Sequence, residues 1–244
     1  MKLHSSTQAA GGLFIGLASL LAVPAQAALI TLPGLGFDVI YDDAILTLGQ
    51  SAPMIQGSTI VFTPNLLKAE SLNGKGTVSV SSNYSFVISP HDGLFVQGIS
   101  ITERGDYLLR NASSWVSVAG LASATALGSL PVDTVSAAVQ ASANLPMNLT
   151  DGLFHDWSAN AVLDMSGHAA FAREADVQFS LNTTLEASTS ASATGPRRAF
   201  IEKKFSGESI TLSVSTTPAV PEPAQWALAF AGLGVLGWRA RRQA

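Results

Sequence analysis

A two-residue alternation of apolar and polar side chains over residues 77–88 constrains this chain more than any other stretch of its sequence. The apolar positions are Val78, Val80, Tyr84, Phe86 and Ile88, and the polar positions are Thr77, Ser79, Ser81, Asn83 and Ser85. A helix repeats about every 3.6 residues, so it cannot sort this sequence onto two faces. The segment therefore predicts a β-strand with one face in a core and the other face in water.

Short strands are also predicted along the rest of residues 28–215. They lie at 37–42, 57–63, 69–72, 95–102, 107–109, 115–119, 177–185, 200–205 and 210–214. Asn73-Gly74 predicts a two-residue hairpin loop, and Glu103–Asp106 predicts a turn. Residues 120–148 are less regular, and short strands and loops are expected there, with a helical turn near Val135–Ala141 as an alternative. Strands at such short intervals favour a single all-β domain, an antiparallel sandwich or jelly roll.

The N-terminus has the features of a secretory signal peptide. Lys2 gives a positive start, Ala9–Ala22 is apolar, and Ala25 and Ala27 form a small-x-small cleavage site. A buried N-terminal helix is the alternative, but the glycines in the apolar run disfavour it. We therefore expect export through the secretion translocon and cleavage by signal peptidase after Ala27.

The C-terminus has three consecutive parts that are typical of a membrane segment with a cytoplasmic basic end. Val220 and the tripeptide Pro221-Glu222-Pro223 come first, and Arg239, Arg241 and Arg242 come last. Between them lies an apolar run whose anchoring side chains are Trp226, Leu228, Phe230, Leu233, Val235, Leu236 and Trp238. The run is shorter than the roughly 20 residues that a spanning helix needs. A plain C-terminal anchor behind an incidental proline-rich linker is one interpretation of these parts.

This tail resembles the PEP-CTERM sorting signal of Gram-negative bacteria that produce extracellular polysaccharide. The resemblance covers residues 220–244 and includes all three parts in the same order. It implies that an exosortase, a membrane processing enzyme, recognises Pro221-Glu222-Pro223 and removes the hydrophobic run. The run would then be a temporary anchor in the inner membrane, before the protein reaches the cell surface or the extracellular matrix. A short, weak anchor suits a segment that is removed.

These features divide the chain into four predicted parts. They are a signal peptide (1–27), an exported β domain (28–215), a Thr/Pro linker with the Pro-Glu-Pro motif (216–223) and a transmembrane sorting helix with a basic end (224–244). Without the two ends, nine Lys and Arg face sixteen Asp and Glu. This acidic balance disfavours binding to nucleic acid. The chain has no cysteine, which excludes disulfides and thiol chemistry.

Two pairs of carboxylates are the first candidates for chemistry. Asp42-Asp43 end a predicted strand, and Glu103 and Asp106 flank the predicted turn. A glycosidase needs two carboxylates about 5–10 Å apart, but acidic residues are common at turns because they are solvated there, and we favour this second interpretation. A calcium site built from Asp38, Asp42 or Asp106 is an alternative that no calcium-loop motif supports. We expect no metal and no cofactor.

The histidines and serines give no catalytic signature. His91, His155 and His168 have none of the spacings of zinc sites. The serine-rich chain also lacks the G-x-S-x-G motif and the α/β pattern that would present a nucleophile. No catalytic residue is therefore predicted.

Aromatic side chains are the remaining candidates, because exposed rings can stack on sugars. We expect Tyr84, Tyr107 and Trp115 in the core, and Trp157, in a polar loop, as the exception. The favoured hypothesis is an exported, non-enzymatic protein of the cell surface or the extracellular polysaccharide or biofilm matrix, with a structural or adhesive role. The alternative is a secreted polysaccharide-acting hydrolase or carbohydrate-binding module on the same β domain.

Overall fold

The computed structural model describes residues 28–45, 51–63, 67–173, 175–192, 194–203 and 209–218, together with Ala231. The predicted signal peptide with its cleavage site, the Pro-Glu-Pro motif, the anchoring side chains and the basic end lie outside these residues. The described part forms thirteen strands and one 3-10 turn, η1 (Asp43–Ile45). The strands are β1 (Leu29–Pro33), β2 (Phe37–Asp42), β3 (Met54–Gln56), β4 (Thr59–Phe62), β5 (Lys68–Leu72), β6 (Gly76–Pro90), β7 (Leu94–Arg110), β8 (Ser114–Ala126), β9 (Thr134–Ala141), β10 (Asp151–Asp164), β11 (Val177–Thr189), β12 (Arg198–Lys203) and β13 (Ile210–Pro218).

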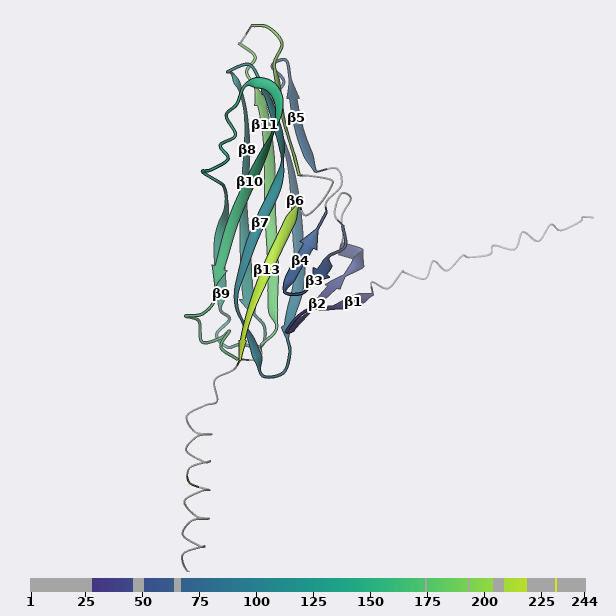
Figure 1. Ribbon diagram of the computed structural model, residues 1–244, viewed down its shortest axis with the longest axis vertical. Helices are drawn as coiled ribbons and strands as arrows, with labels where there is room; N and C mark the ends of the chain where they lie inside the picture. The colour runs from purple at the N-terminus through teal and green to yellow at the C-terminus, as the bar shows by residue number, and fades with distance from the viewer. Residues whose placement is uncertain are drawn as a thin grey trace, which may run out of the picture.

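The described strands form one continuous antiparallel sheet (Figure 1). Their order is β1-β2-β6-β11-β8-β9-β10-β7-β13-β4-β3, and β12 lies between β7 and β5. The long strand β7 pairs with β13 over residues 94–103 and with β12 over residues 105–110. The first and last strands of this order, β1 and β3, come close together. Just after these two strands, the N–H of Leu35 donates to the carbonyl of Gly57 across 2.8 Å, so the sheet nearly closes on itself. The predicted all-β antiparallel class is confirmed, as a single, nearly closed, barrel-like sheet.

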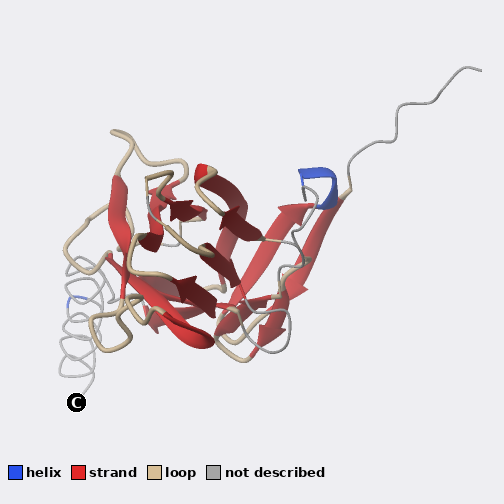
Figure 2. Cartoon of the chain, turned by 90° about the horizontal axis from the view of Figure 1, so that it is seen from above, coloured by secondary structure: helices blue, strands red, loops and turns tan. Residues whose placement is uncertain are grey.

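The view from above shows that the sheet curls round on itself (Figure 2). The buried apolar side chains inside it form one core. On β6, Tyr84, Phe86 and Ile88 are buried and alternate with partly or fully exposed residues, as the sequence predicts. On β11, Phe179 and Leu181 continue the same alternation beside β6. Full burial of each large apolar side chain stabilises the fold by about 1.5–3 kcal/mol. The alternation therefore decides which face of each strand turns inward.

The turn at Asn73-Gly74 is confirmed, but it does not close a hairpin. Both residues have positive φ, 47° and 87°, and the N–H of Lys75 donates to the carbonyl of Leu72. The strand before the turn, β5, pairs with β12, whereas β6 after it pairs with β2 and β11. Gly76, with φ 83°, redirects the chain at the start of β6. The turn therefore carries the chain from one layer of the curled sheet to the other.

Residues 151–164 form the strand β10, so the predicted polar loop around Trp157 is wrong, and other boundaries also differ from the prediction. Residues 57–63 are not one strand, because Gly57, with φ 63°, turns the chain between β3 and β4. Residues 134–141 form the strand β9, within the stretch where short strands are expected, and the alternative of a helical turn is wrong, because these residues pair with β8. The last strand, β13, continues through Pro218 beside β7, so it includes the first residues of the predicted linker 216–223.

The predicted turn at Glu103–Asp106 is wrong, because β7 continues without interruption through these residues. Gly105 lies in the middle of β7, where Trp157 of β10 packs across it. A Cβ atom at Gly105 would lie 2.5 Å from Nε1 of Trp157 and would also clash with the carbonyl oxygen of Glu202. Glycine is required here for close packing, since the indole N–H of Trp157 donates to that carbonyl across 3.0 Å.

We expect Gly105→Ala to destabilise the protein by about 1–3 kcal/mol or more, because the added methyl group meets backbone and an indole ring. Gly167→Ala is the matched control, since a Cβ atom there meets nothing within 4 Å, and it should change the free energy of unfolding by less than about 0.5 kcal/mol. Urea unfolding of both variants measures the difference. Equal stability of Gly105→Ala and the wild type would contradict this packing.

Candidate functional site

The outward side chains of β6, β11, β8 and β9 form a continuous polar surface, which we call the outer face. In register across the sheet, its members are Thr77, Ser79, Ser81, Asn83, Ser85 and Val87 of β6, Gln178, Ser180, Asn182, Thr184 and Glu186 of β11, Trp115, Ser117, Ala119, Leu121, Ser123 and Thr125 of β8, and Thr134, Ser136, Ala138 and Gln140 of β9. Glu186 alone among these members is charged. The outer face is thus broad and nearly uncharged, with mostly hydroxyl and amide groups and the exposed Leu121 among them.

Hydrogen bonds between strands fix many of these side chains. Ser81 and Thr184 share a hydrogen bond of 2.8 Å. Similar pairs join Ser123 to Ser180 and Thr125 to Thr134, at 2.8 Å and 2.9 Å. The hydroxyl of Ser117 donates to Glu186 across 3.0 Å, so the one carboxylate is also held within the outer face. Cross-strand pairs of this kind hold the side chains in fixed positions on the sheet.

The two tryptophans of the β domain lie opposite to the sequence prediction. Trp157 is 1% exposed and belongs to the core, while Trp115 is 43% exposed on the outer face. Tyr84 and Tyr107 are buried, as predicted. The signal for Trp115 was present in the sequence, because the buried Val116 follows it and places the tryptophan on the other face of β8. Trp115 is therefore the aromatic ring that this surface offers to a ligand.

The predicted carboxylate pairs do not converge. Glu103 is fully buried, and Asp106 lies on the opposite face of β7. Asp42 accepts a hydrogen bond from the N–H of Ala44 and caps the 3-10 turn that begins at Asp43. Within the described ranges, no three His, Asp or Glu residues lie close enough to hold a metal ion.

A different acidic row crosses the opposite layer of the sheet. Asp156 of β10, Asp106 of β7 and Glu202 of β12 are register partners on neighbouring strands. Partial burial, together with the charge of Asp106, raises the pKa of Glu202. Directly opposed side chains on paired strands have Cβ atoms about 4.5–5.5 Å apart. Sequence reasoning missed the neighbouring carboxylates of Asp106 and Glu202, because the register between β7 and β12 cannot be read from either strand alone.

Each histidine of the β domain lies beside one aspartate. His91 contacts Asp38 at 3.0 Å, and His168 contacts Asp133 at 3.1 Å. His155 bonds to Asp151 at 2.8 Å, and this bond, with a second one from the N–H of Leu153, holds the pKa of Asp151 below its usual value. These are surface pairs, since each carboxylate is roughly a third or more exposed.

A polar cluster also lies inside the core. Nζ of Lys203 and Oε1 of Glu103 are 2.8 Å apart, and both side chains are 0% exposed. Thr183 donates to the same oxygen across 2.8 Å, and Ser82 lies 3.4 Å from Nζ. Burial raises the pKa of the nearby Tyr84 phenol far above its usual value, with a contribution from the Glu103 charge. The sequence analysis missed this cluster because it placed Glu103 in a turn. In the structure β7 is continuous, and Glu103 follows Ile99 and Ile101 on the inward face.

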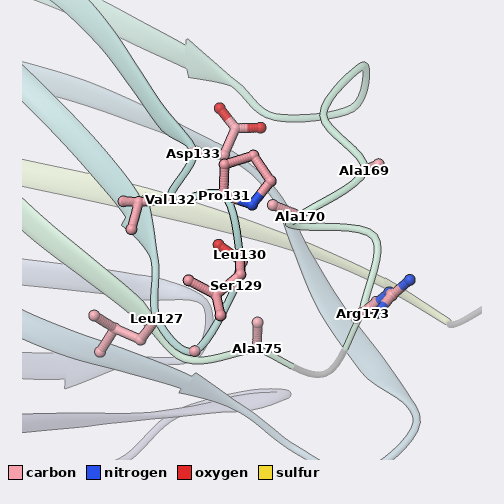
Figure 3. Close-up of a pocket in the computed structure, with 11 residues that line it drawn as sticks. Leu127, Ser129, Leu130, Pro131, Val132, Asp133, Ala169, Ala170, Arg173 and Ala175 are labelled. Carbon is pink, nitrogen blue, oxygen red and sulfur yellow. The ribbon is translucent and has the colours of Figure 1, made fainter.

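Two loops at one end of the sheet border an open pocket of about 610 Å³ (Figure 3). Residues 127–133 line one side of it, and residues of the 169–175 loop line the other. Asp133 and Arg173 are its charged lining residues. Leu130 also lines the pocket, and its side chain is 94% exposed. The pocket lies away from the buried cluster, in the β8–β9 and β10–β11 connections.

Comparison with known proteins gives little about the β domain. No described helix is long and apolar enough to span a membrane. No curated protein matches the chain. A structure of the infectious bursal disease virus Gx strain matches with 16% identity and a TM-score of 0.32, over 71% of this chain and 34% of the viral chain. The crystal structure of the VP2 subviral particle of that virus matches with 14% identity and a TM-score of 0.22, over 86% and 54%.

The chain thus spans about a third to a half of these viral chains. TM-scores this low support no argument about fold or function. The tail gives a direct match instead, over residues 219–243, which begin immediately after β13. This chain carries the PEP-CTERM protein-sorting motif, which marks it as an exosortase substrate.

Proposed function

We propose that this exported protein has a non-enzymatic, structural or adhesive role at the cell surface or in the extracellular polysaccharide matrix. The PEP-CTERM motif implies export, exosortase processing and sorting to the cell surface. The observation that carries the proposal is the position of the motif, directly after the last strand of the β domain. Signal peptidase, acting after Ala27, and an exosortase, acting at Pro221-Glu222-Pro223, are its expected processing partners.

The outer face supports a role in surface contact. A neutral polysaccharide presents many hydroxyl groups and few charges, and the outer face offers matching hydroxyl and amide groups with a single carboxylate. Trp115, at one end of this surface, adds an exposed aromatic ring beside Ser188. Aromatic rings contribute large apolar contact areas in binding sites. The extracellular polysaccharide of the producing cell is therefore the proposed ligand.

A polysaccharide-acting hydrolase is the second candidate, and one observation favours it. Asp106 and Glu202 lie side by side on β7 and β12, and the pKa of Glu202 is raised. A retaining glycosidase uses two carboxyl groups about 5–5.5 Å apart, one of them protonated as the general acid. In this version Glu202 would be the acid and Asp106 the nucleophile.

The sorting part of the proposal is tested by replacing Pro221-Glu222-Pro223 with three alanines. Because an exosortase would no longer recognise the tail, the variant should stay in the membrane fraction at full length. Pro218→Ala, which lies just before the motif, is the control and should be processed normally. Measurement is by cell fractionation and mass spectrometry. Normal release of the triple-alanine variant would show that the tripeptide does not direct processing.

The adhesive part is tested by sedimentation of the protein with extracellular polysaccharide isolated from the producing strain. We expect Trp115→Ala to weaken binding about tenfold, which corresponds to about 1.4 kcal/mol. Leu130→Ala, an exposed apolar residue in the loop pocket, should bind like the wild type. Equal binding of Trp115→Ala and the wild type would show that Trp115 and the outer face around it do not bind the polysaccharide.

The hydrolase version makes a separate prediction. Incubation of the same polysaccharide with the wild type should shorten its chains, and Glu202→Gln should abolish this activity by removing the general acid. Size-exclusion chromatography of the polysaccharide gives the readout. Unchanged chain length with the wild type would eliminate the hydrolase.

A further inference from the structure

The pair of Glu103 and Lys203 joins two neighbouring strands across a long separation in sequence. Glu103 belongs to β7 and Lys203 to β12, and these strands pair directly up to Lys203 opposite Gly105. Residues of the facing layer complete the surroundings, Thr183 from β11 and Ser82 from β6. Both charged side chains are 0% exposed. The two reactive groups are therefore held together in a dry interior.

The hydrogen bonding of this pair is incomplete. Oε1 of Glu103 accepts from both Lys203 and Thr183, at 2.8 Å each. Oε2 of the same carboxylate is buried without a hydrogen-bond partner, and so is the hydroxyl of Tyr84. A buried charge is costly when its remaining lone pairs are not satisfied. An ion pair therefore leaves one carboxylate oxygen of Glu103 buried without a hydrogen bond.

The geometry points to an amide cross-link between Nζ of Lys203 and the side-chain carboxyl carbon of Glu103, formed by the folded protein itself. A proton first passes from the Lys203 ammonium to the Glu103 carboxylate across their hydrogen bond. The neutral amine nitrogen then attacks Cδ of the carboxyl group, and the N–C bond forms. The C–Oε2 bond then breaks, and Oε2 leaves as water with the carboxyl proton and one proton from the amine. No oxidant or reductant is needed. Two charges and the unpartnered oxygen disappear from the core.

The surroundings favour each part of this step. Burial lowers the pKa of Lys203, which increases the share of the neutral, nucleophilic amine. The Thr183 hydroxyl donates to Oε1, where negative charge develops as the nitrogen adds. Holding two groups in contact replaces a bimolecular encounter by an intramolecular one, with effective concentrations of about 10⁵ M or more. The complete burial of both side chains also shields the amide product from bulk solvent.

The cross-link would join residues that are 100 positions apart. The chain has no cysteine and therefore no disulfide. The amide would be a covalent cross-link between two strands of the β domain. It joins β7, which also pairs with β13, to β12. The strand that leads into the sorting tail would thus lie beside a strand that is covalently fixed. This inference is independent of the proposed function, because it concerns the fold alone.

The test is mass spectrometry of the full chain, purified folded and then denatured. We expect a mass lower by about 18 Da, one water, than that of the linear sequence with the same ends. Trypsin should give peptide 76–104 joined to peptide 199–204, because cleavage after a modified Lys203 is blocked. An intact mass equal to the linear sequence, with separate peptides, would overturn the proposal.

Two variants identify the residues involved. Lys203→Met combined with Glu103→Leu keeps the interior apolar and should restore the linear mass. Lys68→Met, an exposed lysine on β5 beside β12, should keep the mass deficit. Succinimide formation at Asp92-Gly93 or Asp151-Gly152 also removes one water. A deficit that persists in the double variant, or that fragment ions place at Asp92-Gly93 or Asp151-Gly152 and not at Glu103 and Lys203, would contradict the cross-link.

Discussion

Burial of one face of each long strand is the constraint on which the rest of this structure depends. The strands β6, β8 and β11 alternate apolar and polar side chains, so a flat sheet would leave a broad apolar surface in water. Curling the sheet encloses Phe86 and Phe179 in one core and turns the polar partners outward. The same closure requires Gly105 beneath Trp157 and draws Glu103 and Lys203 into the dry interior.

Interior and exterior thus have different chemical roles. The interior holds Glu103 and Lys203, the charged members of the buried set among the described residues, and its packing tolerates little change. The outer face is nearly uncharged and is fixed by hydrogen bonds between strands. The sorting motif follows β13, which is paired with β7 along its whole length. Before the tail is removed, a pull on it would therefore pass through β13 into β7, the longest described strand of the sheet.

Sequence reasoning succeeded where a property is local. The alternation over 77–88 gave the buried face of β6, the positive-φ pair Asn73-Gly74 gave a turn, and the tail gave the sorting motif. It failed where the outcome depends on distant partners. The partner of β5 is β12 and not β6, and Gly105 packs against Trp157 instead of making a turn. The pairing of Asp106 with Glu202 likewise depends on a register between distant strands.

The central claim is that the chain is exported and that its tail is removed at the Pro-Glu-Pro motif. The most direct measurement is the mass of the mature protein from the native host, with its C-terminal peptide sequenced. The account predicts a C-terminus close to Pro223, without the apolar run Trp226–Trp238 and without the arginines that follow. A mature protein that still ends at Ala244 would contradict it.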